Sequence, residues 1–284
     1  MVSVERSGSI VAKKMIDLHS HTNISDGELT PEELVQLALK RNLSALAITD
    51  HDQVKAIPPA REVANGTDLE IISGVEVSSS KDGNTLHILG LFVDENHAGL
   101  VKYLEDLRKR RISRAEKMVE RLGRSNINIT LDEILTVAKG GTVGRPHVAK
   151  VLIQKGFVRS TTEAFDRYLA SGRPGFVPYE KAAPQPAIDM IHAAGGLSFL
   201  AHPGLVRNQD LIHEVVDMGI DGLEVIHPDH SKGYVKRYRE MCEELDLLMS
   251  GGSDYHGPHA ERKGDLGKME VPYNFLDAMK VRLD

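Results

Sequence analysis

Short apolar runs alternate with longer amphipathic segments along most of the chain. Runs typical of buried strands cover residues 15–19, 43–49, 69–77, 86–93, 197–201, 221–226 and 247–251. The segments between many of these runs have helical spacing of their apolar positions. Thr30 and Glu33, for example, have the spacing of a capping box, and Pro31 stands in the first turn. This β/α alternation predicts a parallel sheet or a barrel.

The alternation stops after Val93 and resumes near residue 184. Residues 97–122 predict one long, charged helix. Four cationic residues follow one another in it, from Arg108 to Arg111, and we interpret that run as a solvated face. Short helices without a convincing strand follow, at residues 131–138, 147–154 and 162–169. We therefore expect a tail at residues 1–14, a barrel made of residues 15–98 and 184–284, and a helical insertion at residues 99–183 that covers the active site.

Composition and charge narrow the class of protein. The chain has 284 residues, of which 41% are hydrophobic and 27% charged, a globular balance. No apolar run approaches the roughly 18–20 residues of a membrane helix, and residues 1–14 lack a secretory apolar core, so we expect a cytoplasmic protein that does not bind membranes. The net charge of −6 argues against stable DNA binding. It allows a nucleotide substrate, because a pocket needs only a few local cations. The oligomeric state is left open.

Histidine is the most informative residue type, since the chain has 13 histidines and no tryptophan. Nearly every predicted strand ends in His, Asp or Glu, and these candidates are His19, His21, Asp26, His51, Glu76, His87, His202, His227, Asp254 and His256. In a β/α barrel the carboxyl ends of the strands meet at one face. Imidazole nitrogens mixed with carboxylate oxygens suit Zn, Mn or Fe(II). One ion takes about four to six ligands, and the candidates outnumber them. The sequence therefore predicts two or three divalent ions.

The same motifs resemble, in order, those of the PHP superfamily of polymerase and histidinol phosphatase domains. They are His19-Ser20-His21, Thr49-Asp50-His51, Gly74-Val75-Glu76, Ala201-His202-Pro203 and Ser253-Asp254-Tyr255-His256. The resemblance implies a distorted (β/α)7 TIM-like barrel with a metal centre. A helical insertion that contains Gly144-Arg145-Pro146-His147 resembles one branch of this superfamily, which includes nucleoside 3′,5′-bisphosphate and nucleotide phosphatases, some of them also exoribonucleases on short RNA.

The resemblance also implies a set of metal ligands. His19, His21, Glu76 and Asp254 would hold a first ion. Glu76 would bridge to a second ion, held also by His87 and His202. Asp26, His51 and His256 would hold a third. Asp17 lies one layer deeper in the barrel than His19 and His21. Two roles are open for it: a partner that orients an imidazole, or a buried acid paired elsewhere.

A two-metal centre lowers the pKa of a bridging water and holds the oxygens of an in-line displacement, so the expected reaction is hydrolysis of a phosphate ester by a metal-activated hydroxide. Arg145 and Arg173 are candidate substrate contacts, because guanidinium groups bind phosphate bidentately. His147 is a third candidate, because it stands beside Arg145 and would reach the same group. His202 and His227 are the candidate catalytic residues, and His227 would contact the substrate or protonate the leaving group.

Three functions fit these residues. The first is a phosphatase of small nucleotides, acting on a nucleoside 5′-monophosphate or 3′,5′-bisphosphate or on short RNA 5′ ends. The second is a histidinol-phosphate-type phosphatase with a non-nucleotide substrate. The third is a metal-binding interaction module without catalysis. The arginines of the insertion favour the first.

Overall fold

The fold is a closed barrel of strands, seen in a computed structural model that describes residues 14–179, 181–260 and 264–284. The predicted tail at residues 1–14 lies outside the described residues, apart from Lys14. Within the described ranges the strands lie side by side in sequence order: β1 (Met15–Asp17), β2 (Leu43–Ile48), β3 (Glu70–Lys81), β4 (Asn84–Leu91), β5 (Leu197–Leu200), β6 (Gly222–Ile226) and β7 (Leu248–Gly251).

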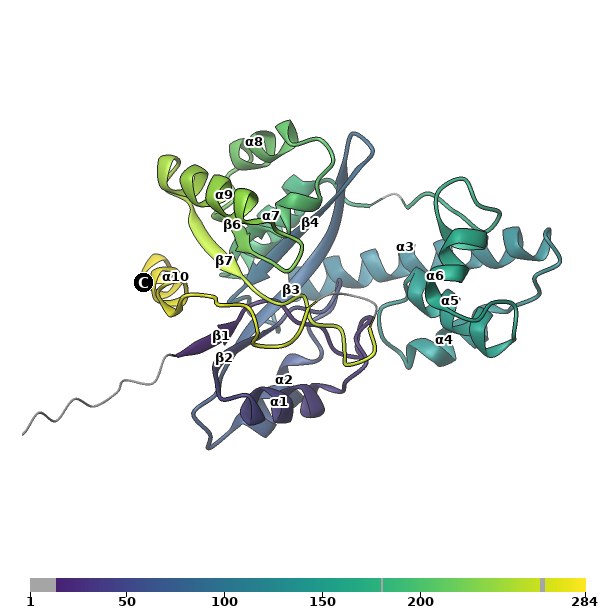
Figure 1. Ribbon diagram of the computed structural model, residues 1–284, viewed down its shortest axis with the longest axis horizontal. Helices are drawn as coiled ribbons and strands as arrows, with labels where there is room; N and C mark the ends of the chain where they lie inside the picture. Colours follow the sequence, from purple (N-terminus) through teal and green to yellow (C-terminus); the bar gives the residue numbers. More distant parts are fainter. Residues whose placement is uncertain (1–13, 180, 261–263) are drawn as a thin grey trace, which may run out of the picture.

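The first and last strands also meet. The backbone N–H of Leu18 donates to the carbonyl of Gly251 at 3.2 Å, and Ser20 forms a parallel bridge with Tyr255. These contacts close the sheet into a barrel in which the first and last strands, β1 and β7, are adjacent (Figure 1). The predicted distorted seven-stranded barrel is confirmed.

One strand departs from the predicted parallel arrangement. β4 is antiparallel to both β3 and β5. A parallel pair needs a crossover of a dozen or more residues, whereas only Asp82 and Gly83 join β3 to β4. Both residues have positive φ angles, 49° and 75°, as in a type I′ hairpin turn. The expectation of parallel strands is therefore wrong at β4, and Asp-Gly is the sequence signal that should have shown it.

Helices cover the outside of the barrel: α1 (Pro31–Lys40), α2 (Ile57–Ala64), α7 (Pro184–Ala193), α8 (Asp210–Asp217), α9 (Lys232–Glu244) and α10 (Tyr273–Leu283), with a 3₁₀ turn η2 (Pro203–Leu205). The capping box of α1 is present, since Thr30 Oγ1 accepts from the N–H of Glu33 at 3.2 Å. The pattern analysis did not predict α2, whose first turn contains Pro58 and Pro59. None of the described helices combines the length and apolar character that crossing a membrane requires.

A second group of helices extends to one side of the barrel: α3 (Ala98–Gly123), α4 (Leu131–Ala138), α5 (Arg145–Gln154), α6 (Thr161–Ala164) and a π-helical turn η1 (Phe165–Leu169). Figure 1 shows α3 running from the barrel towards α4, α5 and α6. Leu100 and Leu104, in the first half of α3, pack into the core of the barrel. Met118 and Leu122, in the second half, pack into a separate core formed with α4, α5 and α6. The long helix thus joins two hydrophobic cores.

Candidate metal centre

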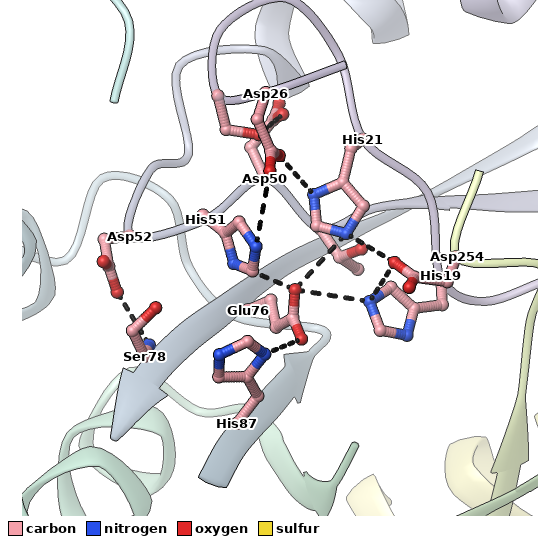
Figure 2. A network of polar contacts seen from close by, with 12 residues as sticks. His19, His21, Asp26, Asp50, His51, Asp52, Glu76, Ser78, His87 and Asp254 are labelled. Atoms are coloured by element: carbon pink, nitrogen blue, oxygen red, sulfur yellow. Dashed lines mark hydrogen bonds and ion pairs between the residues drawn. The ribbon is translucent and has the colours of Figure 1, made fainter. Parts of the chain in front are cut away.

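The predicted ligands come together at one end of the barrel. His19 and His21 follow β1, His51 follows β2, His202 follows β5, and Asp254 and His256 follow β7. Glu76 and His87 differ from this pattern because they lie inside the β3–β4 hairpin, which is longer than predicted. Ten side chains from across the chain nevertheless meet: His19, His21, Asp26, His51, Glu76, His87, His202, His227, Asp254 and His256. Figure 2 shows several of them directed towards one another.

Glu76 lies at the centre of this cluster. Its Oε2 atom is 2.9 Å from His51 Nδ1, 3.3 Å from His21 Nε2 and 3.5 Å from His19 Nε2. Its Oε1 atom faces the other way, 2.6 Å from His87 Nδ1 and 2.9 Å from His202 Nε2. The two oxygens of one buried carboxylate therefore serve two sets of imidazoles, which is the arrangement a ligand that bridges two ions needs.

Three groups of donor atoms are compact enough for metal binding, with all ligand atoms of each group within 4.8 Å of one another. The first contains His19, His21, Glu76 and Asp254, the same four residues as in the predicted first ion set. The second contains His51, Glu76 and His87; His202 also contacts Glu76, as the distances above show. The third contains His21, Asp26, His51 and His256, that is, the predicted third set together with His21.

The residues fit divalent ions on two further observations. His19 Nε2, both ring nitrogens of His21 and His51 Nδ1 are buried and form no hydrogen bond of adequate geometry among the described residues, although Glu76 Oε2 lies 2.9 to 3.5 Å from three of them. A buried polar atom without a partner is costly, and an ion would satisfy several of these atoms at once. The mixture of nitrogen and oxygen donors suits Zn, Mn or Fe(II) better than Mg or Ca.

The pKa values show how strongly these groups interact. Burial would raise the pKa of Glu76, but the neighbouring imidazoles of His51, His87 and His19 outweigh it and hold the pKa well below its usual range. Burial would lower the pKa of His21, but Asp254 and Glu76 raise it to about 9. Because a metal ligand must be deprotonated, ion binding at His21 competes with a proton and releases it.

The loop that carries Asp26 is held in place by Asp50. Asp50 Oδ1 accepts from the backbone N–H of Thr22 at 2.8 Å and from Ser25 Oγ at 2.5 Å. Its Oδ2 accepts from Thr22 Oγ1 at 2.6 Å. Both oxygens are thus occupied by this loop, so Asp50 positions Asp26 near His256, 3.3 Å away, and His51.

Asp17 proves to be an acid paired with backbone amides. Its Oδ1 accepts from the N–H of Ser253 at 2.9 Å, and its Oδ2 accepts from the N–H of Gly267 at 2.8 Å. Of the two alternatives for this residue, pairing elsewhere is the one observed. Since Ser253 precedes Asp254, the contact fixes the loop that carries a candidate ligand.

Glu224 is a site residue that sequence reasoning missed. This fully buried carboxylate on β6 accepts from the ring Nδ1 of His19 at 2.9 Å and from the backbone N–H of His202 at 2.6 Å. The first contact leaves Nε2 of His19 free to face the ion site. The second holds His202, whose φ of 32° lies in the left-handed region that non-glycine residues rarely adopt. The sequence offered one sign of this role, because Glu224 is an acid within an otherwise apolar strand, Gly222-Leu223-Glu224-Val225-Ile226.

Replacing Glu224 with glutamine should weaken metal binding by about 10–100-fold, the range seen when a partner of a ligand is lost. The amide can accept from only one of the two N–H groups and turns a donor towards the other. Competition titration of Mn²⁺ against a chelator would measure the change. Glu244→Gln, an exposed substitution on α9, is the matched control; equal affinity of both variants would contradict this role for Glu224.

The same residue should make stability depend on pH. Burial would raise the pKa of Glu224, but His19 lowers it to about 2, below the ordinary value of about 4.3. A lowered folded-state pKa stabilises the fold above the unfolded-state pKa, and that contribution is lost as the pH falls towards 2. The difference in unfolding free energy between the wild type and Glu224→Gln, measured by urea unfolding, should therefore shrink below about pH 4.

His227 lies at the edge of the cluster, with its ring centroid 5.4 Å from that of His202. It is buried, and its Nε2 atom is 3.6 Å from Asp254 Oδ2. Its Nδ1 accepts from the backbone N–H of Asp229 at 3.2 Å, which fixes the ring. The fixed ring directs Nε2 towards the acidic side of the cluster.

A cavity of about 270 Å³ adjoins the cluster and separates it from the helical insertion. Asp26, His51 and His87 of the barrel line it. Cationic and aromatic residues of the insertion line it as well: Arg111, Arg114, Arg145, Phe165, Tyr179 and Lys181. A compartment lined by both candidate metal ligands and cations is suited to an anionic ligand.

The predicted substrate contacts have different places in the structure. Arg145 lines the cavity, with its guanidinium 5.2 Å from the ring centroid of Phe165. His147 is buried, and its Nδ1 accepts from the N–H of Gly144 at 3.1 Å, so it holds the turn that presents Arg145. Arg173 is exposed in a loop outside the residues that line the cavity. Direct contact of His147 or Arg173 with a substrate stays a prediction.

Two arginines of α3 belong to this cavity although the pattern analysis did not assign them there. The interpretation of the Arg108–Arg111 run as solvated is wrong for Arg111, whose Nε donates to Asp52 Oδ2 at 2.7 Å and whose Nη2 donates to Ser78 Oγ at 2.6 Å. Arg114 donates through Nε to the carbonyl of Val177 at 2.9 Å. Burial, followed by the charge of Arg145, lowers the pKa of Arg114 to about 10.

Comparison with known proteins agrees with this geometry. The PHP domain matches residues 17–171. The chain is 38% identical to the 5′-3′ exoribonuclease Rnm of Escherichia coli over 85% of both chains. It is 33% identical to a 3′,5′-nucleoside bisphosphate phosphatase of Chromobacterium violaceum, over 90% of this chain and 91% of that one.

Solved structures are similar over nearly the whole chain. A Bifidobacterium adolescentis protein assigned as a metal-dependent phosphoesterase superposes with a TM-score of 0.86 at 28% identity, covering 95% of this chain and 96% of that one. The strand-end motifs, the closed barrel and these relatives agree, and the resemblance predicted from the motifs is confirmed. The chain belongs to the PHP domain family.

Proposed function

We propose that this protein is a metal-dependent hydrolase that removes phosphate from nucleotides, with the metal-binding cluster and the phosphate-binding cations around the same cavity. The observation that carries the proposal is the cavity itself, because it joins Asp26, His51 and His87 to Arg114 and Arg145. The relatives named above, an exoribonuclease and a nucleoside bisphosphate phosphatase, act on substrates of the same class.

The residues of the cluster would hold two or three ions of Mn, Fe or Zn. His19, His21, Glu76 and Asp254 would hold one; Glu76 would share a second with His87 and His202; Asp26, His51 and His256 would hold a third. Bound ions would lower the pKa of a water molecule, so that hydroxide is available for attack near neutral pH, and would neutralise the charge of the phosphate. We assign His202 and His227 as the candidate catalytic residues, and His227 would contact the substrate or protonate the leaving group.

The arginines would position the rest of the substrate. Among the described residues, no carboxylate pairs with Arg114 or Arg145; Arg114 donates to the carbonyl of Val177, and Arg145 donates to the carbonyl of Leu169. Carbonyls do not neutralise a guanidinium, so two positive charges remain available to an anion. Phe165 and Tyr179 add flat apolar surfaces on which a base can stack. In this proposal the insertion, residues 99–183, covers the site and selects the substrate.

Replacing Arg145 with alanine should lower kcat/KM for a nucleoside 3′,5′-bisphosphate by about 10–100-fold, the effect of losing charge-assisted hydrogen bonds worth about 1.5–3 kcal/mol. An aryl phosphate has no second phosphate to lose, so its kcat/KM should change little. Steady-state kinetics of both substrates would measure this. Lys150→Ala, which removes an exposed cation of α5, is the control. Equal losses on both substrates would contradict binding of a second phosphate by Arg145.

A further inference from the structure

A stripe of cations follows the second half of α3. The spacing of 4, 3, 4 and 3 residues places Arg110, Arg114, Lys117, Arg121 and Arg124 on one face of the helix. Arg114 is half-buried at the cavity, whereas the other four are exposed. With a rise of about 1.5 Å per residue, the stripe is about 21 Å long.

The charges of this stripe are not neutralised within the part of the chain that the structure describes. None of its five members forms an ion pair there, although Glu120 stands at helical spacing from both Lys117 and Arg124. Elsewhere on the same helix, by contrast, Lys102 and Lys109 share Asp106 at 3.0 and 3.2 Å. The stripe is thus a local positive surface on a chain whose net charge is −6.

The stripe is continuous with the cavity at one end. Arg114 belongs to both, and beyond it the segment 174–177 lies along the same face of α3. Arg114 Nε donates to the carbonyl of Val177 at 2.9 Å, and Arg121 Nε donates to the carbonyl of Pro174 at 3.2 Å. This segment therefore begins beside Arg121, and Arg173 directly precedes it.

We propose that this stripe binds the backbone of a single-stranded RNA whose terminal nucleotide occupies the cavity. The inference rests on the proposed function and adds to it a binding surface outside the cavity. A strand whose terminal nucleotide occupies the cavity must lead the rest of its phosphates out of it, and Arg114 is the residue at which the cavity and the positive stripe meet. Exposed cations in a row bind phosphates independently of the nucleotide sequence. The stripe therefore favours longer strands over mononucleotides, whatever their bases.

The test is a triple variant, Lys117→Gln/Arg121→Gln/Arg124→Gln, which leaves every residue that lines the cavity unchanged. With the metal-loaded enzyme, kcat/KM for a nucleoside 3′,5′-bisphosphate should stay as in the wild type. For a 5′-phosphorylated ten-nucleotide RNA, kcat/KM at low salt should fall by about 10–100-fold. The slope of log(kcat/KM) for this RNA against log salt should become less steep by about 2, since each lost phosphate contact contributes about 0.7.

A charge-matched control is the variant Lys102→Gln/Lys109→Gln/Lys236→Gln, which removes three exposed cations elsewhere. Its kcat/KM for both substrates should equal that of the wild type. Two results would contradict RNA binding by the stripe: a stripe variant that hydrolyses RNA with wild-type kcat/KM and salt dependence, or one that loses kcat/KM equally on both substrates. A wild-type enzyme that hydrolyses neither substrate would instead overturn the proposed function.

Discussion

Replacing Glu76 with glutamine should reduce kcat by on the order of 10³-fold or more, the scale expected when charge stabilisation of a transition state is lost. Its two carboxylate oxygens face five imidazoles at 2.6 to 3.5 Å. An amide offers one weak acceptor and turns an N–H₂ group towards imidazole nitrogens that a metal would use. The bridge between two ion sites is therefore removed, while the volume of the side chain is kept.

Metal content separates this effect from misfolding. The Glu76→Gln protein should bind fewer ions per chain, measured by elemental analysis after gel filtration, while circular dichroism shows a folded barrel. Glu62→Gln, an exposed substitution on α2, should keep both activity and metal content. A Glu76→Gln enzyme with wild-type turnover and a full complement of ions would contradict a bridging role for this carboxylate.

Replacing Arg111 with methionine should lower the free energy of unfolding by about 3 kcal/mol or more, as when one partner of a buried ion pair is removed. Arg111 ties α3 to the barrel through Asp52 and Ser78, and its side chain is only 11% exposed. Burial would lower its pKa, but Asp52 raises it above the ordinary arginine value. Methionine keeps most of the apolar contact and leaves the carboxylate of Asp52 buried without its cation.

A double variant tests this explanation. Asp52→Asn removes the uncompensated charge, so Arg111→Met/Asp52→Asn should be more stable than the sum of the two single effects predicts, by at least about 1 kcal/mol of coupling. Urea unfolding of the four proteins gives the coupling energy. Strict additivity would show that the two side chains do not stabilise the fold as a pair.

The sequence predicted which side chains meet at one end of the barrel better than it predicted the strand directions. Motifs such as His19-Ser20-His21 are local, and the closing of the barrel brings them together in any β/α arrangement. The direction of β4 depended on Asp82 and Gly83, a two-residue turn hidden between two apolar runs. Because β3 continues to Lys81, Glu76 lies within that strand instead of at its end.

Residues that act through others were harder to find. Glu224 has no motif, and its role follows only from its hydrogen bond to His19 within the barrel. The consecutive cations from Arg108 to Arg111 point in different directions around α3, and only the rotation of the helix decides that Arg111 faces Asp52. Sequence spacing shows which residues share a face of a helix, but tertiary packing decides which face meets the barrel.

The central claim is that side chains distant in the sequence share metal ions at the open end of the barrel. Anomalous diffraction from crystals soaked in Mn²⁺ tests it directly. The account predicts anomalous peaks within ligand distance of Glu76, one of them shared with His19, His21 and Asp254, and a further peak beside Asp26 and His256. Mn²⁺ bound only elsewhere on the protein, with no peak among these residues, would contradict it.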